Sequence, residues 1–316
     1  MQPFPEIISK SESKEYNIVR LSKTNLADVA KLHAAVYGVS VEVDYFPKKY
    51  NTTYIGVEYV GFLAYDQSAQ PVAYFGVIPC FFQYDGDIIL SGQAADGMTH
   101  PRHLGKGLFV KLSDKTFDLC KQLQLKLIFG FPNQRSYPLM IKYLGWTEIE
   151  KMYRFTIPVN SMMSMMPAFL KKINYNRILN EQPGFQKGLP NSAVRDGYAG
   201  VYRDAAYCRY KAYNKTHLIK IPAAEIWLKP GNELVIGDVV SLEPGSDDLF
   251  FTGLAQLAGR LWMDKISFQV CSGTHLHQLF AKRYEAVPSF PVLVKCFAPG
   301  IVPEKFKFSF ADIDIF

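Results

Sequence analysis

Cysteine is scarce in this sequence of 316 residues, and the few cysteines that occur follow no motif. The five cysteines are an odd number without Cys-x-x-Cys spacing, so they indicate neither a disulfide framework nor a zinc site. The one His-x-His pair, His275 and His277, has no further ligands at a suitable spacing, and no metal is expected. Reduced, buried thiols and a cytoplasmic location fit this composition better than an oxidising compartment.

Long apolar stretches and long basic stretches are missing as well. No apolar run reaches the ~18 residues of a transmembrane helix, so no transmembrane segment is expected. The first residues lack the basic head and apolar centre of a secretory signal. Lysines and arginines are scattered and the formal net charge is only +6, which argues against nucleic acid as a partner.

Apolar and aromatic side chains are abundant. Hydrophobic residues make up 48% of the chain and aromatic residues 14%, which is enough for a large core. In the first half, the apolar periodicity predicts a mixed α/β sheet in the order β-α-β-β-β-α-β-α-β. The expected strands cover residues 16–20, 54–65, 71–84, 88–98, 125–131 and 146–157. The expected helices cover residues 25–37, residues 106–123 and a segment that ends at Leu144.

The second half predicts a similar succession of elements without a direct repeat of sequence. Helices are expected over 202–214, 249–263 and 275–282, and strands over 217–228, 233–242, 265–271 and twice more before the chain ends. We therefore expect two domains of one kind, residues 1–157 and 198–316. The linker between them, residues 158–197, contains a Met-rich basic helix, for which packing between the domains is favoured over contact with a membrane surface.

The most informative segment runs from Ile88 to Phe109, where a strand ends, a Gly-Lys-Gly loop turns and a helix begins. Backbone amides in such a loop, together with the helix N-terminus, form a site for a pyrophosphate. The P-loop pattern GxxxxGK[ST] is absent, and Gly105-Lys106-Gly107 is not followed by the third glycine of a dinucleotide fingerprint. Of the three kinds of phosphate-binding site considered, a coenzyme A site is the one that remains.

Here the sequence resembles the GNAT superfamily of acyl-CoA-dependent N-acetyltransferases, whose pyrophosphate motif is [Arg/Gln]-x-x-Gly-x-[Gly/Ala]. Residues 102–107 match this motif literally, but the position of Pro101 favours the register Leu104–Phe109, in which the first basic residue of the motif is lost. Asn133 after the next strand and the helix end at residues 144–146 (Leu-Gly-Trp) also resemble the family. The whole chain is similar to tandem GNAT proteins with a degenerate second half.

The resemblance implies a mixed α/β, GNAT-like fold in two tandem domains, with a site for acetyl-CoA in the first domain. The pantetheine arm would add to the end of the strand before the loop, and the pyrophosphate would lie on the loop amides. The implied cofactor-binding residues are Gly97, Met98, Thr99, Leu104, Gly105, Lys106, Gly107, Leu108, Phe109 and Asn133.

The implied reaction is acyl transfer from a thioester to an amine, which needs a base, an oxyanion donor and an acid. The family supplies the oxyanion donor from a backbone amide, here near Met98 and Thr99. A carboxylate near the end of that strand, Asp96, is the candidate base. Ile141 replaces the family's acid tyrosine, which leaves Tyr137 as a candidate acid. Further candidates near the loop are Tyr143, His100 and His103.

The chain end offers another candidate. Residues 305–316 alternate phenylalanines with polar residues and predict a final strand with an ordered terminal carboxylate on Phe316. That carboxylate, Asp312 or Asp314 could hold or deprotonate the acceptor amine, although a purely structural strand is the favoured interpretation.

We therefore expect an N-acetyltransferase that moves an acetyl group from acetyl-CoA to an amine of a small molecule or sugar. Two alternatives stay open. The missing acid tyrosine favours a non-catalytic acyl-CoA-binding protein, and the tandem layout suggests a related aminoacyl or acyl transferase, against which the Gly-x-Gly loop argues. The second half has no Gly-x-Gly loop at a helix start and is expected to bind no coenzyme A. Formation of a homo-oligomer is left open.

Overall fold

The structure is a computed structural model that describes residues 15–179 and 185–316. The start of the chain, for which no secretory signal is expected, lies outside the described residues. Two compact units form from interleaved segments. The first contains Met1–Cys80, Leu90–Glu148 and Leu293–Ile301, and the second contains Phe81–Ile89, Ile149–Val292 and Val302–Phe316. The domain boundaries expected after residues 157 and 197 remain a prediction.

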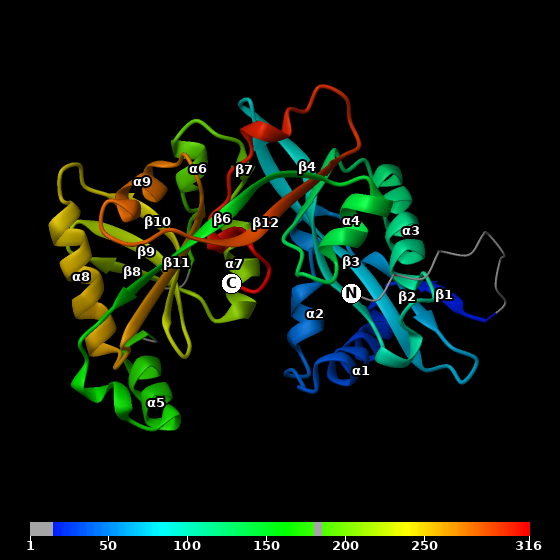
Figure 1. Cartoon of the computed structure of the whole chain (residues 1–316), viewed down its shortest axis with the longest axis horizontal. Helices are drawn as coiled ribbons and strands as arrows, with labels where there is room; N and C mark the ends of the chain where they lie inside the picture. Colours follow the sequence, from blue (N-terminus) through cyan, green and yellow to red (C-terminus); the bar gives the residue numbers. More distant parts are fainter. Residues whose placement is uncertain (1–14, 180–184) are drawn as a thin grey trace, which may run out of the picture. The chain divides into compact units, whose positions relative to one another are not determined.

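The strands of the first unit form a mixed sheet (Figure 1). In spatial order they are β1 (Asn17–Arg20), β2 (Val60–Tyr65), β3 (Pro71–Tyr84), β4 (Asp87–Thr99), β5 (Leu127–Gly130) and the end of β12 (Val287–Cys296). The pairs β1–β2, β2–β3 and β5–β12 are antiparallel, whereas β4 and β5 run parallel. The strand expected over 54–65 begins only at Val60, because residues 53–55 form a 3-10 turn that ends at Gly56 with a φ of +75°.

In the described part of the first unit, helices cover both faces of the sheet. They are α1 (Leu26–Tyr37), α2 (Tyr45–Lys49), α3 (Leu108–Gln122) and α4 (Tyr137–Leu144), with 3-10 turns at Lys23–Asn25, Thr53–Ile55 and Pro101–His103. Strand side chains alternate between the two faces, as β3 shows. Phe75 contacts Phe109 and Phe117 of α3, whereas Tyr74 contacts Tyr50 at the end of α2. The helices α2 and α3 therefore lie on opposite faces of β3.

The strands of the second unit are also mixed in direction. In spatial order its strands are β6 (Thr147–Pro158), β11 (Lys265–Cys271), β10 (Leu234–Leu242), β9 (Ala224–Pro230) and β8 (His217–Ile221), and β7 (Gly200–Val201) pairs with residues 82–83 of β3. The strands β10 and β11 run parallel, and the pairs β6–β11, β9–β10 and β8–β9 are antiparallel. The single strand expected over 217–228 is a hairpin, because Ala223 adopts a left-handed φ of +65° between β8 and β9.

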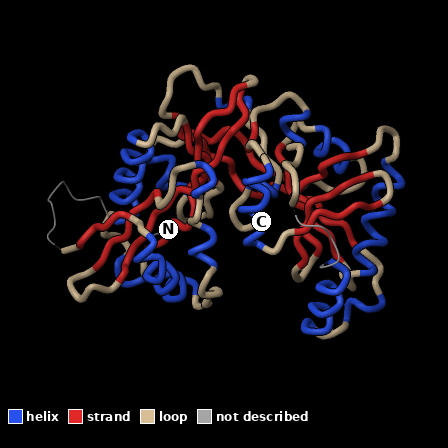
Figure 2. Tube along the Cα trace, turned by 180° about the vertical axis from the view of Figure 1, so that it is seen from behind, coloured by secondary structure: helices blue, strands red, loops and turns tan. Residues whose placement is uncertain are grey.

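Helices flank the strands of the second unit as well (Figure 2). They are α5 (Ala168–Leu179), α6 (Ser192–Arg195), α7 (Ala205–Lys211), α8 (Asp247–Arg260) and α9 (His275–Ala281), with 3-10 turns at Met162–Met165, Ala212–Asn214, Pro303–Lys305 and Phe310–Asp312. Ile226 and Leu228 of β9 share an apolar core with residues of α8 and α9. Trp227, between them in sequence, instead contacts Phe316, so the chain end lies on the face opposite this core.

The last segment of the chain departs from expectation. The prediction of a strand over residues 305–316 is wrong. Residues 303–305 and 310–312 form 3-10 turns instead, and Phe306 and Ser309 each form a single β-bridge. The amide of Ser309 donates to the Asp312 carboxylate (2.9 Å), a local hydrogen bond that closes a turn in place of a strand ladder. The alternation correctly indicated burial, which is complete or nearly so for Phe306, Phe308, Phe310, Ile313 and Phe316.

Candidate active site

The Gly-Lys-Gly loop leads directly into α3. Gly105 and Gly107 have φ values of +76° and +70°, a backbone region that favours glycine, and Gly107 is the N-cap of the helix. Apart from chain neighbours, no heavy atom of the described residues lies within 4 Å of the position that a Cβ would take on either glycine. The first amides of a helix have no partner within it, and the first turn of α3 carries no acidic residue. The loop is therefore suited to an anion.

The strand that precedes this loop, β4, diverges from its neighbour β5. Their parallel pairing joins residues 91–93 to residues 127–129, and Asp96 then adopts a left-handed φ of +53°. A Cβ on the next residue, Gly97, would lie 2.8 Å from the Phe109 ring, so the glycine lets α3 pack closely on the diverging strand. This packing brings the end of β4 beside the start of the helix that carries the loop.

The end of β4 directs a backbone amide away from β3. The amide of His100 donates to the Val72 carbonyl on β3 (2.8 Å). Since the amides of successive strand residues point to opposite edges, the amide of Thr99 points to the edge on the β5 side. That edge is where the pantetheine arm is expected, and the amides of residues 98 and 99 are the expected oxyanion donors.

Asp96, the candidate base, is held by two buried side chains. The Nζ atom of Lys49 lies 2.8 Å from each carboxylate oxygen, and the Tyr50 hydroxyl donates to Oδ2 over 2.7 Å. Lys49 and Tyr50 are each only 1% exposed. Burial and the negative charge of Asp96 raise the pKa of Tyr50 well above its usual value, so the phenol stays protonated. The role of Asp96 as the base remains a prediction.

Sequence reasoning missed α2 and with it Lys49 and Tyr50. The helix spans only five residues and contains Pro47, so it is too short to show helical periodicity. The available signal was the run of aromatic residues and lysines over 45–50. Tyr37 at the end of α1 belongs to the same neighbourhood, because burial and the charge of Asp96 both raise its pKa.

The helix α4 carries the candidate acid. The Tyr137 hydroxyl donates to Glu148, and this hydrogen bond raises the pKa of the phenol. The side-chain oxygen of Asn133 accepts hydrogen bonds from the backbone amides of residues 135 and 136 (2.9 and 3.0 Å). These bonds stabilise the turn before α4. Ile141, at the position of the family's tyrosine, is exposed. The roles predicted for Tyr137 in acid catalysis and for Asn133 in cofactor binding remain predictions.

The second unit repeats this divergence of parallel strands, but the chain's own end occupies it. The pairing of β10 with β11 stops at Phe268, and the next part of β11 forms a bridge from Val270 to Ser309. The other edge of β11 is already paired there with β6, so Ser309 lies at the edge that β10 has left. The Phe316 ring fills the space over Gly237, where no side chain would fit.

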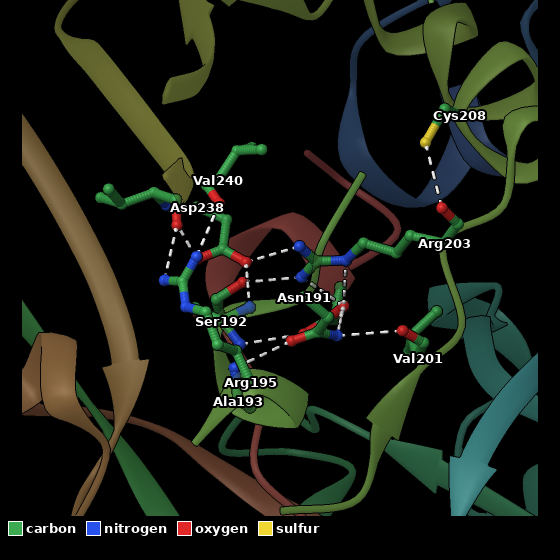
Figure 3. A network of polar contacts seen from close by, with 12 residues as sticks. Asn191, Ser192, Ala193, Arg195, Val201, Arg203, Cys208, Asp238 and Val240 are labelled. Atoms are coloured by element: carbon green, nitrogen blue, oxygen red, sulfur yellow. Dashed lines mark hydrogen bonds and ion pairs between the residues drawn. The ribbon is translucent and has the colours of Figure 1, made fainter. Parts of the chain in front are cut away.

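Arg203 fixes this terminal segment to β10 (Figure 3). Its buried guanidinium donates to Asp238 of β10, to Asp312 (2.8 Å) and to the Ser309 hydroxyl (3.0 Å). The amide of Ser192 also donates to Asp238 (3.1 Å). Two carboxylates thus share one cation, and desolvation raises the pKa of Asp312. The network is fully enclosed and serves to anchor the chain end.

Side-chain donors also hold each of the last four backbone carbonyls. Hydrogen bonds join Lys211 to Ile313 (2.6 Å), Tyr213 and Asn214 to Asp314 (2.8 Å each), Lys229 to Ile315 (2.7 Å) and Asn214 to Phe316. Burial lowers the pKa of the Lys211 ammonium to about 7. Residues 313–316 therefore form a firmly held segment, and the action of a Phe316 carboxylate on an acceptor remains a prediction.

Other chemistry finds little support in the described ranges. Within residues 15–179 and 185–316, no group of three or more His, Cys, Asp or Glu side chains is placed to hold a metal ion. Burial raises the pKa of Cys120 to about 12 and that of Cys208 to about 11, so neither thiol is an activated nucleophile. No helix in the described part of the chain is long and apolar enough to cross a membrane.

Solved structures resemble this chain throughout, although no family model and no curated protein matches it. A GCN5-related N-acetyltransferase from Kribbella flavida is 11% identical, with 89% of this chain and 71% of that chain covered and a TM-score of 0.58. One from Anabaena variabilis is 14% identical, with 89% and 72% covered and a TM-score of 0.56. One from Sphaerobacter thermophilus is 13% identical, with 92% and 98% covered and a TM-score of 0.51. The chain has the fold of GCN5-related N-acetyltransferases in a tandem arrangement, as the resemblance implied.

Proposed function

We propose that this chain is an acyltransferase that moves an acetyl group from acetyl-CoA to a small amine. The observation that carries the proposal is the pair of left-handed glycines, Gly105 and Gly107, at the start of α3, with open space above both. Such a loop binds a pyrophosphate through backbone amides, and the helix dipole adds attraction for an anion. The fold supports the same assignment.

In the proposed complex, the pyrophosphate of acetyl-CoA lies on the amides of residues 105–109. The pantetheine arm runs along the edge of β4 past residue 93, where the parallel pairing with β5 has ended. Its amide groups add to that edge as a peptide adds to a sheet. The thioester carbonyl then lies near the amide of Thr99, which points to this edge.

The proposed reaction is a direct attack on the thioester. The nitrogen of the deprotonated amine forms a bond to the carbonyl carbon, and the negative charge that develops on the oxygen is stabilised by the amide of residue 98 or 99. The carbon–sulfur bond then breaks, and the leaving thiolate takes a proton. Asp96 and the Phe316 carboxylate are the candidates that accept the proton of the amine, and Tyr137 is the candidate that protonates the thiolate.

The second unit is proposed to bind no coenzyme A. Residues 308–309 already lie along the diverging edge of β11. The first turn of α8 carries Asp247 and Asp248, whose charges oppose an anion at that helix start. One coenzyme A per chain is therefore expected.

The test is release of free thiol from acetyl-CoA by the purified chain, followed over a panel of amines that includes amino sugars. Thiol release that depends on one class of amine would support the proposal. Binding of acetyl-CoA without thiol release for every amine would favour the second candidate, a non-catalytic acyl-CoA-binding protein. The exposed Ile141 in place of a tyrosine and the ion pair on Asp96 are the observations that favour that alternative. The acceptor, a homo-oligomer and a cytoplasmic location stay predictions.

A further inference from the structure

The segment that links β6 to the rest of the second unit exposes an unusual set of apolar side chains. Met165 is 94% exposed, Phe169 63% and Ile173 62%, and Met163 is exposed as well. Single exposed apolar residues are ordinary on a protein surface. Here four of them lie within eleven residues, 163–173, on one 3-10 turn and the helix α5. We call these four residues the α5 patch.

The opposite face of α5 fastens the helix to the second unit. Asn174 and Leu179 are buried, and the Asn174 side chain donates to the Arg260 carbonyl at the end of α8 (2.8 Å). Tyr175 and Ile178 pack against the apolar core of the unit. Phe169 and Ile173 are four residues apart and therefore share the face that points away from this core. The helix lies at the edge of the second unit, beyond α8 and β8 (Figure 1).

The charged residues of the segment that carries the α5 patch have one sign. Residues 159–179 contain Lys171, Lys172 and Arg177 and no aspartate or glutamate. Lys172 and Arg177 are exposed on the same side as the patch. A helix with an exposed apolar stripe and a basic border is the type that lies in the interface of an anionic bilayer, with its apolar side chains among the acyl chains. A protein partner for so basic a surface would need an acidic, apolar groove of its own.

We infer that the α5 patch binds an anionic membrane surface and holds the protein at the bilayer as a peripheral protein. Phe169 and Ile173 enter the boundary between headgroups and acyl chains, Met163 and Met165 extend this contact, and Lys172 and Arg177 lie among the anionic headgroups. The inference does not depend on acyl transfer, since it rests on a helix of the second unit. The buried face of α5 packs on the second unit itself, and packing between the domains, which the sequence favoured for this helix, remains a prediction.

Sedimentation of the full chain with lipid vesicles tests the inference. The chain is expected to bind vesicles of phosphatidylcholine with phosphatidylglycerol and to remain free with phosphatidylcholine alone. Replacement of both Lys172→Ala and Arg177→Ala should weaken binding about thirtyfold, since each basic residue near an anionic surface contributes a factor of roughly five. The double variant Phe169→Ser with Ile173→Ser should abolish binding. Leu249→Ser is the matched control, because Leu249 is also exposed on a helix of the second unit.

A second measurement reports the depth of the helix. Tryptophan placed by Phe169→Trp should be quenched by brominated acyl chains in anionic vesicles, with no quenching in vesicles of phosphatidylcholine. Equal binding of the Phe169→Ser, Ile173→Ser variant and the wild type would overturn the inference, as would failure of the wild type to bind anionic vesicles. A dimer in solution that this double variant converts to a monomer would also overturn it, because a second copy would then cover the patch.

Discussion

The ammonium of Lys49 lies 2.8 Å from both carboxylate oxygens of Asp96, and this ion pair joins the short helix α2 to the diverging end of β4. The second unit contains a similar pair, in which Arg203 just before α7 binds Asp238 on β10. In each unit, a carboxylate on the strand before the long helix is paired with a buried cation. The arrangement stabilises the strand where it leaves its parallel neighbour.

Removal of one partner of the first pair should be costly. Lys49→Met leaves the Asp96 carboxylate with the Tyr50 hydroxyl but without its cation, and we expect the free energy of unfolding to fall by about 3 kcal/mol. The double variant Lys49→Met with Asp96→Asn should recover much of this loss, because no uncompensated charge remains. Urea denaturation of the three proteins measures both effects. Equal stability of the single and double variants would show that the pair does not act as a unit.

The same variants separate structure from catalysis at Asp96. If Asp96 is the base, the double variant should be nearly as stable as the wild type and still lose kcat, with little change in KM for acetyl-CoA. If the carboxylate only holds α2 against β4, activity should follow stability across the set.

The low pKa of Lys211 predicts a pH-dependent stability. Burial lowers this pKa from 10.5 to about 7 in the folded chain. Between these values the unfolded chain binds the proton and the folded chain does not, so the wild type gains stability as the pH rises and loses it as the pH falls towards 7, by at most about 1.4 kcal/mol per pH unit. The free energy of unfolding of the wild type, minus that of Lys211→Met, should therefore increase as the pH rises across this window. A constant difference would contradict the assignment.

The amide of Thr99 should matter more than its side chain. Thr99→Pro removes the amide that points to the edge facing away from β3, whereas the neighbouring pairing from His100 to Val72 is kept. We expect Thr99→Pro to lower turnover with acetyl-CoA at least tenfold, and Thr99→Val, which retains the amide, to change it little. Normal turnover of the proline variant would exclude pantetheine and the oxyanion from this edge.

The role of the chain end can be tested without removing the buried ring of Phe316. The Phe316 ring is fully buried against Gly237 and Trp227, so deleting the residue would leave a cavity as well as move the carboxylate. One glycine added after Phe316 keeps the ring and displaces only the charge. If the terminal carboxylate receives the amine proton, this extension should lower kcat and leave the affinity for acetyl-CoA unchanged. Asp314→Asn is the matched test of the side chain, and full activity in both proteins would leave the chain end structural.

Patterns of local origin could be predicted from the sequence. The strand, the glycine loop and the amphipathic helix α3 follow one another closely in the chain, and each has a characteristic periodicity or turn residue. The Gly-x-Gly spacing predicts a turn into a helix, and the structure has this turn; the anion site on it remains a prediction.

Features that depend on distant contacts could not be predicted. Lys49 and Asp96 are 47 residues apart, and nothing in the sequence around either residue indicates the other. The chain end has the alternation of a strand, yet the local hydrogen bond of Ser309 with Asp312 and the pairing of Arg203 with Asp312 bend it into turns. The left-handed turn at Ala223 also has no glycine to mark it, so the hairpin of β8 and β9 appeared as one strand.

Calorimetric titration with acetyl-CoA tests the central claim most directly. The wild type should bind one acetyl-CoA per chain, and Gly107→Val, which places a side chain over the loop amides, should bind at least tenfold more weakly, a loss of ~1.4 kcal/mol. Gly245→Val is the matched control, because Gly245 precedes α8 with a similar φ of +73° and similar open space, so it bears the same backbone strain without touching the loop. We predict that only the Gly107 variant loses affinity. Unchanged affinity of a folded Gly107→Val protein, or two equivalent sites in the wild type, would contradict the account.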